Sequence, residues 1–591
     1  MNWSRSNNTF LILNLFSNQD QRRIALVSFL QITLGLLDLA GVVAIGLLGS
    51  VATLGVTSTE PGGNTKRLLE FLGLENQSLS YQISALGLTA ATVLIVKTVL
   101  SAIFSLKIIN FLSSRTATIS SDFIGKLLKR NLEGLNRLKP NEVIYAMSTG
   151  INTLTMGVLV QGISIVVDAS LLFLLGFALF VTDPVLAIFT LAYFASISAG
   201  LYQQLNTKSR NLGRKSSDLF LVMHNRINEL LGNYREITVK NLRGSYLQKI
   251  EENRVALSKV LARLSFYPNL SKYALEVGLV FGALVISSYQ LVFNNSSGAV
   301  ATLGVFLIAS LRIAPALLRI QQSLTSMKRA LGQSESTLVL LRRLQEIEPI
   351  SSNKGEFQTF HKGFSPRIEF KEITFSYDGQ TSQIIKNFSL DVKPGSKVAI
   401  RGKSGVGKTT LIDLMLGLLE PTNGEIRISG LSPIECFEKW PGAVSYVPQQ
   451  VFIIEGTIRE NLSIGFETHL IPESRFYDSL RKCELEDLVR ELPEGLDTFI
   501  GKGGRELSGG QKQRLGIARS LMTSPKLIVL DEATSALDVV TQNKIRDTLI
   551  AKHDKTTMIL ISHQKNTISN CETILDMHSK GKLVVRTQKR K

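Results

Sequence analysis

A glycine-rich run at residues 402–409, GKSGVGKT, has the residue types and the spacing that bind a nucleotide phosphate. It follows a run that predicts a strand and precedes a run that predicts a helix. Glycines let the backbone wrap tightly, so that successive N–H groups point at phosphate oxygens. Lys408 would reach the β- and γ-phosphates, and Thr409 would ligate Mg²⁺. The residues predicted to bind the nucleotide here are Gly402, Lys403, Ser404, Gly405, Val406, Gly407, Lys408, Thr409 and Thr410.

Two neighbouring carboxylates end the apolar run LIVLDE at residues 527–532, which predicts a buried strand. Asp531 fits a second contact to Mg²⁺, and Glu532 fits a base that polarises an attacking water. The alternative is that the two carboxylates only cap the next helix. Because the glycine-rich run is present in the same chain, we favour hydrolysis of a nucleoside triphosphate.

A third motif, LSGGQ at residues 507–511, opens a predicted helix. At a helix N-terminus, hydroxyl and N–H groups of Ser508, Gly509 and Gly510 can stabilise an anion. Together, the three motifs resemble the ATPase domain of ABC transporters, and the resemblance covers about residues 368–585.

The resemblance implies ATP as the nucleotide and assigns further residues by motif. Tyr377 matches the aromatic residue that stacks on adenine, and Gln449 in YVPQQ matches a residue that touches the metal and the membrane domain. His563 in LISHQ matches the switch histidine, and Gln511 completes the signature motif. In this family the signature covers the ATP bound to another subunit, which implies a dimer. Because every motif is intact, a homodimer with two competent sites is expected, and a heterodimer stays open.

Six apolar runs are long enough to cross a membrane, which takes about 20 apolar residues. They are residues 24–54, 83–109, 157–181, 184–201, 273–293 and 301–318. The connections after the second and fourth runs are long and rich in Lys and Arg, so they and both termini are expected in the cytoplasm. Their helical periodicity predicts helices that extend beyond the bilayer. Loops of this kind explain the net charge of +18 without a nucleic-acid partner.

After residue 367 the pattern changes to short apolar runs that alternate with helical ones, as in a mostly parallel α/β sheet. The sequence thus predicts a membrane α-helical bundle of six transmembrane helices at residues 1–325, a linker at 326–366, and an α/β P-loop nucleotide-binding domain at 367–591. The order resembles a half-transporter of the exporter type. This resemblance implies two coupling helices, near 135–142 and near 231–238.

Charged residues inside the predicted spans are costly and often functional. Arg312 and Arg319 are seven residues apart, so a helix places them on one face. With Lys97 and Lys272 they form a candidate set for binding an anionic substrate, because Arg clamps phosphate well. Two other interpretations of these cations stay open. The cations could pair with acidic residues of neighbouring spans, or Lys272 and Arg319 could snorkel to the interface.

The span pattern, the RIAPALLRI run and a predicted short amphipathic helix at residues 64–74 resemble bacterial flippases of lipid-linked oligosaccharides. This resemblance implies a polyprenyl-pyrophosphate lipid as substrate and a bacterial inner membrane as location, with the ATPase domain in the cytoplasm. Lys97 and Lys272 stand where that family has arginine, which removes the bidentate geometry. The alternatives are an exporter of another lipid, a drug or a peptide, and an ATP-gated regulator without net pumping.

Overall fold

The computed structural model describes most of the chain in two compact units. The described residues are 16–57, 70, 73, 77–130, 132–182, 184–293, 296–345, 347, 357–377, 382–501, 506–534, 537–551, 555–562, 564, 568–578 and 582–588. One unit comprises Met1–Lys129 and Arg137–Ile350, and the other comprises Arg130–Asn136 and Ser351–Lys591. Most of the amphipathic helix expected at residues 64–74 lies outside the described residues.

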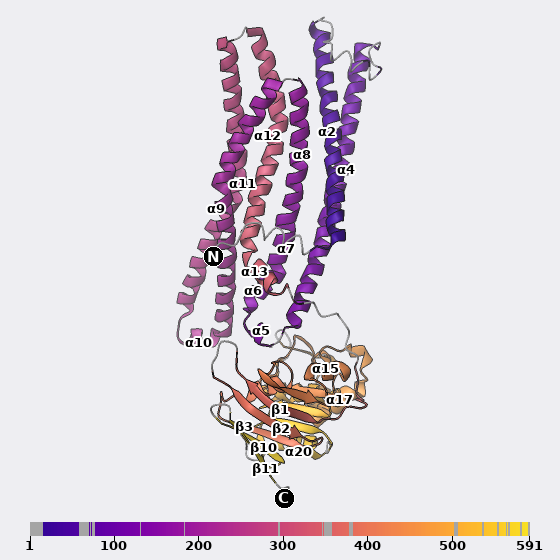
Figure 1. Cartoon of the computed structure of the whole chain (residues 1–591), viewed down its shortest axis with the longest axis vertical. Helices are drawn as coiled ribbons and strands as arrows, with labels where there is room; N and C mark the ends of the chain where they lie inside the picture. The colour runs from indigo at the N-terminus through magenta and orange to yellow at the C-terminus, as the bar shows by residue number, and fades with distance from the viewer. Residues whose placement is uncertain are drawn as a thin grey trace. The chain divides into compact units, whose positions relative to one another are not determined.

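The first unit is a bundle of long helices that run side by side (Figure 1). The helices are α2 (Asn18–Thr57), α4 (Leu79–Leu128), α8 (Gln161–Thr182), α9 (Pro184–Gly232), α11 (Arg243–Phe293) and α12 (Ser296–Gln333). Five of the six predicted spans fall within one of these helices, and the span at 157–181 begins in the π-helical turn Thr155–Val160 and continues into α8. Among the described residues, three stretches are long and apolar enough to cross a membrane: Leu79–Leu128, Pro140–Val181 and Pro184–Gly232. The remaining predicted spans include residues whose side chains lie outside the described part.

The stretch Pro140–Val181 changes helical winding along its length. It begins with α6 (Pro140–Tyr145), alternates between two π-helical turns and the short α7 (Ile151–Leu154), and continues as α8. Such π-turns insert an extra residue into a helix and are frequent at functional sites. Here they precede the part of α8 that lines the transmembrane cavity described below.

Helices α9 and α12 approach each other closely at two glycines. A Cβ atom on Gly213 would overlap the carbonyl oxygen of Arg329, and one on Gly332 would overlap that of Arg210. Any larger side chain at either glycine would therefore push the two helices apart.

Short helices lie where the coupling helices were expected. Residues 135–142 include the end of α5 (Leu132–Asn136) and the start of α6, and residues 231–238 overlap α10 (Tyr234–Val239). Helix α5 belongs to the second unit, where the Leu132 N–H donates to the Leu418 carbonyl at 3.0 Å. The expected linker at 326–366 contains the end of α12 and helix α13 (Glu335–Arg343).

The second unit is built on a six-stranded sheet, shown in orange to yellow in Figure 1. Its order is β11 (Lys582–Thr587), β10 (Thr573–His578), β3 (Lys397–Gly402), β9 (Thr557–Ile561), β8 (Leu527–Asp531) and β5 (Val444–Val447). Neighbouring strands are parallel except β10 and β11. Every residue of β8 and β9 is buried, as their continuous apolar runs predict. Parallel pairing brings the carboxyl ends of β3, β5 and β8 to one edge.

A second, antiparallel sheet contains β2 (Ile385–Val392), β1 (Ile368–Phe375) and β4 (Asn423–Ile428), in that order. The helices of this unit include α14 (Lys408–Met415), α17 (Glu473–Lys482), α18 (Glu486–Arg490), α19 (Gly509–Leu521) and α20 (Val539–Ala551). Both sheets and these helices enclose an extensive apolar core.

Candidate nucleotide site and transmembrane cavity

The glycine-rich run connects β3 to α14, as the sequence predicts. Gly405 and Gly407 have φ angles of +75° and +107°, in the left-handed region that favours glycine. A Cβ atom on Gly407 would also lie 2.6 Å from a methyl carbon of Ile384. Both glycines are therefore needed for the tight turn that points backbone N–H groups toward a phosphate.

Lys408 is the first residue of α14, and its side chain is 9% exposed. Its ammonium donates to the Gly402 carbonyl at 2.9 Å and lies 3.8 Å from a carboxylate oxygen of Glu532. The next residue, Thr409, donates from its hydroxyl to Asp531 at 3.5 Å. The structure thus brings the glycine-rich run and the two carboxylates, more than 120 residues apart in the chain, to one place.

Glu532 follows directly after β8 with a φ angle of +48°, and its N–H donates to the Ile561 carbonyl at 3.2 Å. An energetically costly left-handed conformation at a non-glycine residue often marks a functional site. Gln449, two residues after β5, donates from its side-chain amide to the Glu532 carboxylate at 2.8 Å. Gln449 and Glu532 are neighbours because β5 and β8 are parallel neighbours.

Burial dominates the electrostatics beside this site. It raises the pKa of Asp531, and the nearby charge of Glu532 adds to the rise, whereas Thr409, Lys408 and Tyr446 oppose it. Burial and then Asp531 raise the pKa of Asp413 to about 6. Burial and the same carboxylates raise the pKa of Tyr446 to about 12.

Sequence reasoning missed Tyr446 and Asp413. Tyr446 lies on β5, three residues before Gln449, and its side chain interacts with Asp531. Asp413 lies four residues after Thr409 on α14, so both project from one face of that helix. The four-residue spacing was a usable signal in the sequence, but the contact of Tyr446 needed the strand order.

Tyr377 lies just after β1 and contacts α14. Its hydroxyl is 3.1 Å from the Thr410 hydroxyl, and its ring packs edge-on against Phe375 with centroids 5.0 Å apart. These contacts place an aromatic ring beside the first turn of α14. Its expected stacking on adenine stays a prediction.

The LSGGQ motif opens α19, as the sequence predicts, and Ser508 caps the N-terminus of this helix. Its hydroxyl accepts the Gln511 N–H at 3.2 Å, and the Gln511 side chain accepts the Ser508 N–H at 2.8 Å. This reciprocal pair defines the start of the helix, where Gly509 and Gly510 stand. The role of these four residues toward a second chain stays a prediction. His563, the expected switch histidine, lies outside the described residues.

Helix α19 is also connected to the segment that follows Gln449. Arg519, near its C-terminus, donates to the Asn461 carbonyl at 2.7 Å and to the Phe452 carbonyl at 3.1 Å. Burial lowers the pKa of Arg519. Sequence reasoning missed this arginine, because its partners lie more than 50 residues away in the chain.

In the first unit, a cavity of about 730 Å³ lies among α2, α4, α8 and α12. Two of the four cations predicted to bind a substrate, Lys97 and Arg319, line it. The Arg319 guanidinium donates to the Asp168 carboxylate, also in the lining, at 2.7 Å. The remaining polar lining residues are Gln31, Thr98, Ser101, Ser105 and Ser164.

The two other predicted cations do not join this lining among the described side chains. The Lys272 ammonium lies 3.8 Å from Glu276, one turn further along α11, and both side chains are exposed. Arg312 belongs to α12, but its side chain lies outside the described part of the structure. The structure thus brings Lys97 and Arg319 to one cavity and places Lys272 elsewhere.

Comparisons with known proteins found similarity to ABC transporters. Residues 385–535 match the protein family described as ABC transporter, which implies ATP binding. An uncharacterised ABC transporter ATP-binding protein of Bacillus subtilis, YwjA, is 35% identical over 40% of this chain and 41% of its own length. A multidrug resistance ABC transporter ATP-binding and permease protein of Lactococcus lactis is 28% identical over 62% of this chain and 61% of its own length.

The curated relatives above are thus matched over less than two thirds of their own length. A solved structure of a bacterial Atm1-family ABC exporter with ATP bound covers 96% of this chain and 95% of its own, with 20% identity and a TM-score of 0.74. This likeness confirms the predicted fold class of a transmembrane helical domain followed by an α/β nucleotide-binding domain. The chain therefore has the fold of an ABC exporter, and its residues 385–535 match the ABC transporter family.

Proposed function

We propose that the chain is one half of a dimeric exporter that hydrolyses ATP to move a substrate across a membrane. The observation that carries this proposal is the convergence of Lys408, Thr409, Gln449, Asp531 and Glu532 at one edge of the sheet. These residues combine a phosphate-binding loop with a positioned carboxylate, which is the arrangement that phosphoryl transfer to water requires.

Residues of the chain fit a magnesium ion by their chemistry. Mg²⁺ prefers oxygen ligands, and the Thr409 hydroxyl and the Asp531 carboxylate lie 3.5 Å apart. The Gln449 amide nitrogen is engaged with Glu532, which leaves its amide oxygen as the atom suited to a metal. When bound, Mg²⁺ neutralises charge on the phosphate oxygens.

Each site residue then has a role in hydrolysis. Lys408 and the backbone N–H groups of the glycine-rich run hold the phosphates. Glu532 accepts a hydrogen bond from the attacking water and orients it toward the γ-phosphate, and Gln449 holds Glu532 in place. His563 would contact the γ-phosphate.

Two chains complete the site in this proposal. Ser508, Gly509 and Gly510 of one chain would cover the ATP bound to its partner, because a helix N-terminus stabilises negative charge. A homodimer supplies two such sites, and a heterodimer with a related chain is the alternative.

For the substrate, we propose a polyprenyl-pyrophosphate lipid that carries an oligosaccharide, in a bacterial inner membrane. The transmembrane cavity supports an amphiphile with an anionic, hydroxyl-rich head, since Lys97, Arg319 and several hydroxyl groups line it. Arg312 and Lys272 extend the proposed set of cations. The alternative is another lipid, a drug or a peptide.

The test is ATP-driven movement of a fluorescent polyprenyl-pyrophosphate oligosaccharide across proteoliposomes. We expect wild type to flip it, Glu532→Gln to abolish both hydrolysis and flipping, and Arg312→Ala/Arg319→Ala to hydrolyse ATP without flipping. Wild type that hydrolyses ATP but moves none of the lipid would refute the substrate and leave the ATPase. Absence of any hydrolysis that depends on Glu532 would refute the proposed function itself.

A further inference from the structure

The C-terminal end of α19 is the opposite end of the helix that begins at the LSGGQ motif. The last carbonyl groups of a helix have no partner within it and need other donors. After Leu521 the chain passes through Met522 and reverses at Ser524, whose φ angle is +52°. The Ser524 N–H donates to the Leu521 carbonyl at 3.2 Å, but the carbonyl groups of Leu521 and Met522 also face a side chain from another helix.

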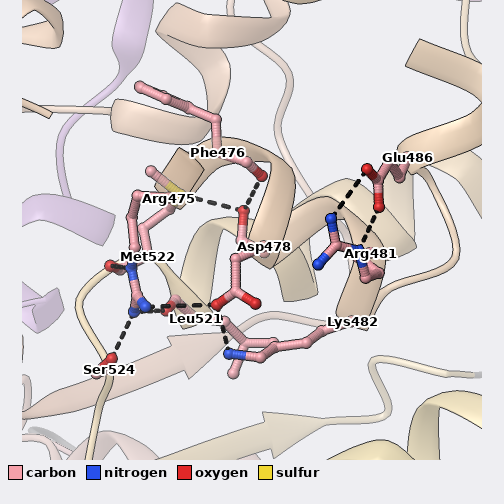
Figure 2. A network of polar contacts seen from close by, with 10 residues as sticks. Arg475, Phe476, Asp478, Arg481, Lys482, Glu486, Leu521, Met522 and Ser524 are labelled. Atoms are coloured by element: carbon pink, nitrogen blue, oxygen red, sulfur yellow. Dashed lines mark hydrogen bonds and ion pairs between the residues drawn. The ribbon is translucent and has the colours of Figure 1, made fainter. Parts of the chain in front are cut away.

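That side chain is Arg475, from α17. Its Nε donates to the Met522 carbonyl at 2.6 Å, and one of its terminal nitrogens donates to the Leu521 carbonyl at 2.8 Å and to the Ser524 hydroxyl. Figure 2 shows the guanidinium facing all three groups. The planar fork of an arginine suits such adjacent acceptors, whereas a lysine offers one point of contact.

Arg475 is enclosed more than a surface arginine. Its side chain is 18% exposed, and burial lowers its pKa, with Asp478 at 3.6 Å acting in the opposite direction. A cation that is largely removed from water is tolerated when its donors are satisfied. Most of the hydrogen bonds of Arg475 go to the end of α19, so the cost of burying it is offset at that helix end.

We propose that Arg475 is a positioning residue for ATP hydrolysis, which fixes the direction of α19 and thereby the place where Ser508 and Gly509 meet the nucleotide. This inference rests on the proposed function. Helix α17, which carries Arg475, is itself packed into the protein, because Phe476 and Leu480 are fully buried in the core that also contains α19.

Because α19 is long, a small tilt at the end held by Arg475 moves the LSGGQ end by a large distance. The helix has 13 residues. At 1.5 Å per residue it is about 20 Å long, so a tilt of about 5° about its anchored end moves the other end by about 1.7 Å. Misplacing a group by about 1 Å in an active site can cost about 100-fold in rate.

The same helix offers a matched control. Arg481, six residues after Arg475, binds Glu486 of α18 at 2.6 Å (Figure 2). Arg481 and then Arg490 lower the pKa of Glu486 to about 2. This pair connects α17 to α18 and does not include α19, so its loss removes an arginine from α17 without releasing the signature helix.

The test compares Arg475→Lys, Ser524→Ala and Arg481→Ala in the full chain, reconstituted in proteoliposomes. We expect Arg475→Lys to lower kcat for ATP hydrolysis at least about tenfold while KM for ATP stays within about twofold, because the phosphate-binding loop lies on other elements. Ser524→Ala, which removes one acceptor, should lower kcat about two- to threefold, and Arg481→Ala should change neither constant.

Unchanged kcat in Arg475→Lys overturns the inference. A loss of kcat and thermal stability that Arg481→Ala reproduces also overturns it, since it would show a general structural effect. If Arg475→Lys does not fold, Ser524→Ala takes its place, and an unchanged kcat in Ser524→Ala overturns the inference.

A second readout separates this inference from the proposed function. Hydrogen exchange of the α19 amides should be faster in Arg475→Lys than in Arg481→Ala. Equal exchange refutes the anchoring even if ATP is hydrolysed. If the wild type does not hydrolyse ATP but exchange at α19 is still faster in Arg475→Lys than in Arg481→Ala, the anchoring is supported and only the proposed function is refuted.

Discussion

The side-chain amide of Gln449 donates a hydrogen bond of 2.8 Å to the carboxylate of Glu532. The two residues are 83 positions apart in the chain and meet because β5 and β8 are parallel neighbours. The other carboxylate oxygen of Glu532 lies 3.8 Å from the ammonium of Lys408. The proposed base is therefore held from two sides, by the glycine-rich run and by the segment after β5.

Removing the amide should release this carboxylate. We expect Gln449→Ala to lower kcat for ATP hydrolysis by about 10- to 100-fold, the loss that follows when a charged group loses a hydrogen bond worth about 1.5–3 kcal/mol. Steady-state kinetics measure the effect, and Gln450→Ala is the control at the neighbouring position. Wild-type kcat in Gln449→Ala would contradict the role of this contact.

Local sequence patterns predicted the elements of the nucleotide site, and the reason is physical. The turn after β3 needs glycine at positive φ, and the run before Asp531 is apolar because both faces of β8 are covered. The rule that carboxyl ends of parallel strands share an edge then places Gln449 and Glu532 at the same edge, and the pairing of β5 with β8 makes them neighbours. The glycine turn and the apolar strand are set by the residues of each segment itself, so a local sequence pattern reveals them.

Contacts between distant segments could not be predicted in this way. Arg475 and Leu521 are 46 residues apart, and Arg319 and Asp168 are 151 apart. Seven-residue spacing placed Arg312 and Arg319 on one helical face, but it gave no partner for either. The pairing of Lys272 with Glu276 is local, at four residues, and could have been expected from the sequence.

Asp576 provides a prediction for the pH dependence of stability. Its side chain is 6% exposed, and it lies 2.6 Å from Arg401 and 3.1 Å from Arg586. Arg401 contributes most to holding the pKa of Asp576 below its ordinary value of 3.8. The folded state thus binds this proton more weakly than the unfolded chain, so the stabilisation is present above that value and is lost as the pH falls through the lowered pKa.

We expect Asp576→Asn to lower the free energy of unfolding by about 1–3 kcal/mol at pH 7, and by less below pH of about 4. Thermal unfolding of the detergent-solubilised chain at both pH values measures the difference. Asp391→Asn is the control, because Asp391 also pairs with an arginine, Arg367, but is 45% exposed and should matter less. An equal loss from Asp576→Asn at both pH values would contradict the assigned cause.

The three cysteines give a prediction about thiol chemistry. Cys436, Cys483 and Cys571 are free and buried. Burial raises the pKa of Cys436 and Cys571 to about 11 and that of Cys483 further. Because the thiolate is the reactive form, a maleimide should label none of them in the folded protein and all three after unfolding. Ser508→Cys, at the exposed start of α19, should label quickly, and rapid labelling of the wild type would refute the prediction.

The ion pair between Arg319 and Asp168 gives a prediction for the proposed substrate. An anionic head group would have to displace Asp168 in order to bind Arg319. The side chain of Arg319 is 49% exposed and that of Asp168 is 14% exposed. A partly exposed pair is worth about 0.2–1 kcal/mol, so an anion that replaces Asp168 competes with an interaction of that size.

Asp168→Asn should therefore lower the KM for a polyprenyl-pyrophosphate substrate by up to about fivefold. Arg319→Ala should abolish translocation while basal ATP hydrolysis persists. Lys272→Ala removes the proposed cation that pairs with Glu276 on α11 and is not in the cavity lining, so it should change KM less than Arg319→Lys does. If Asp168→Asn raises KM instead, the pair serves to hold α8 against α12, and the anion must bind elsewhere.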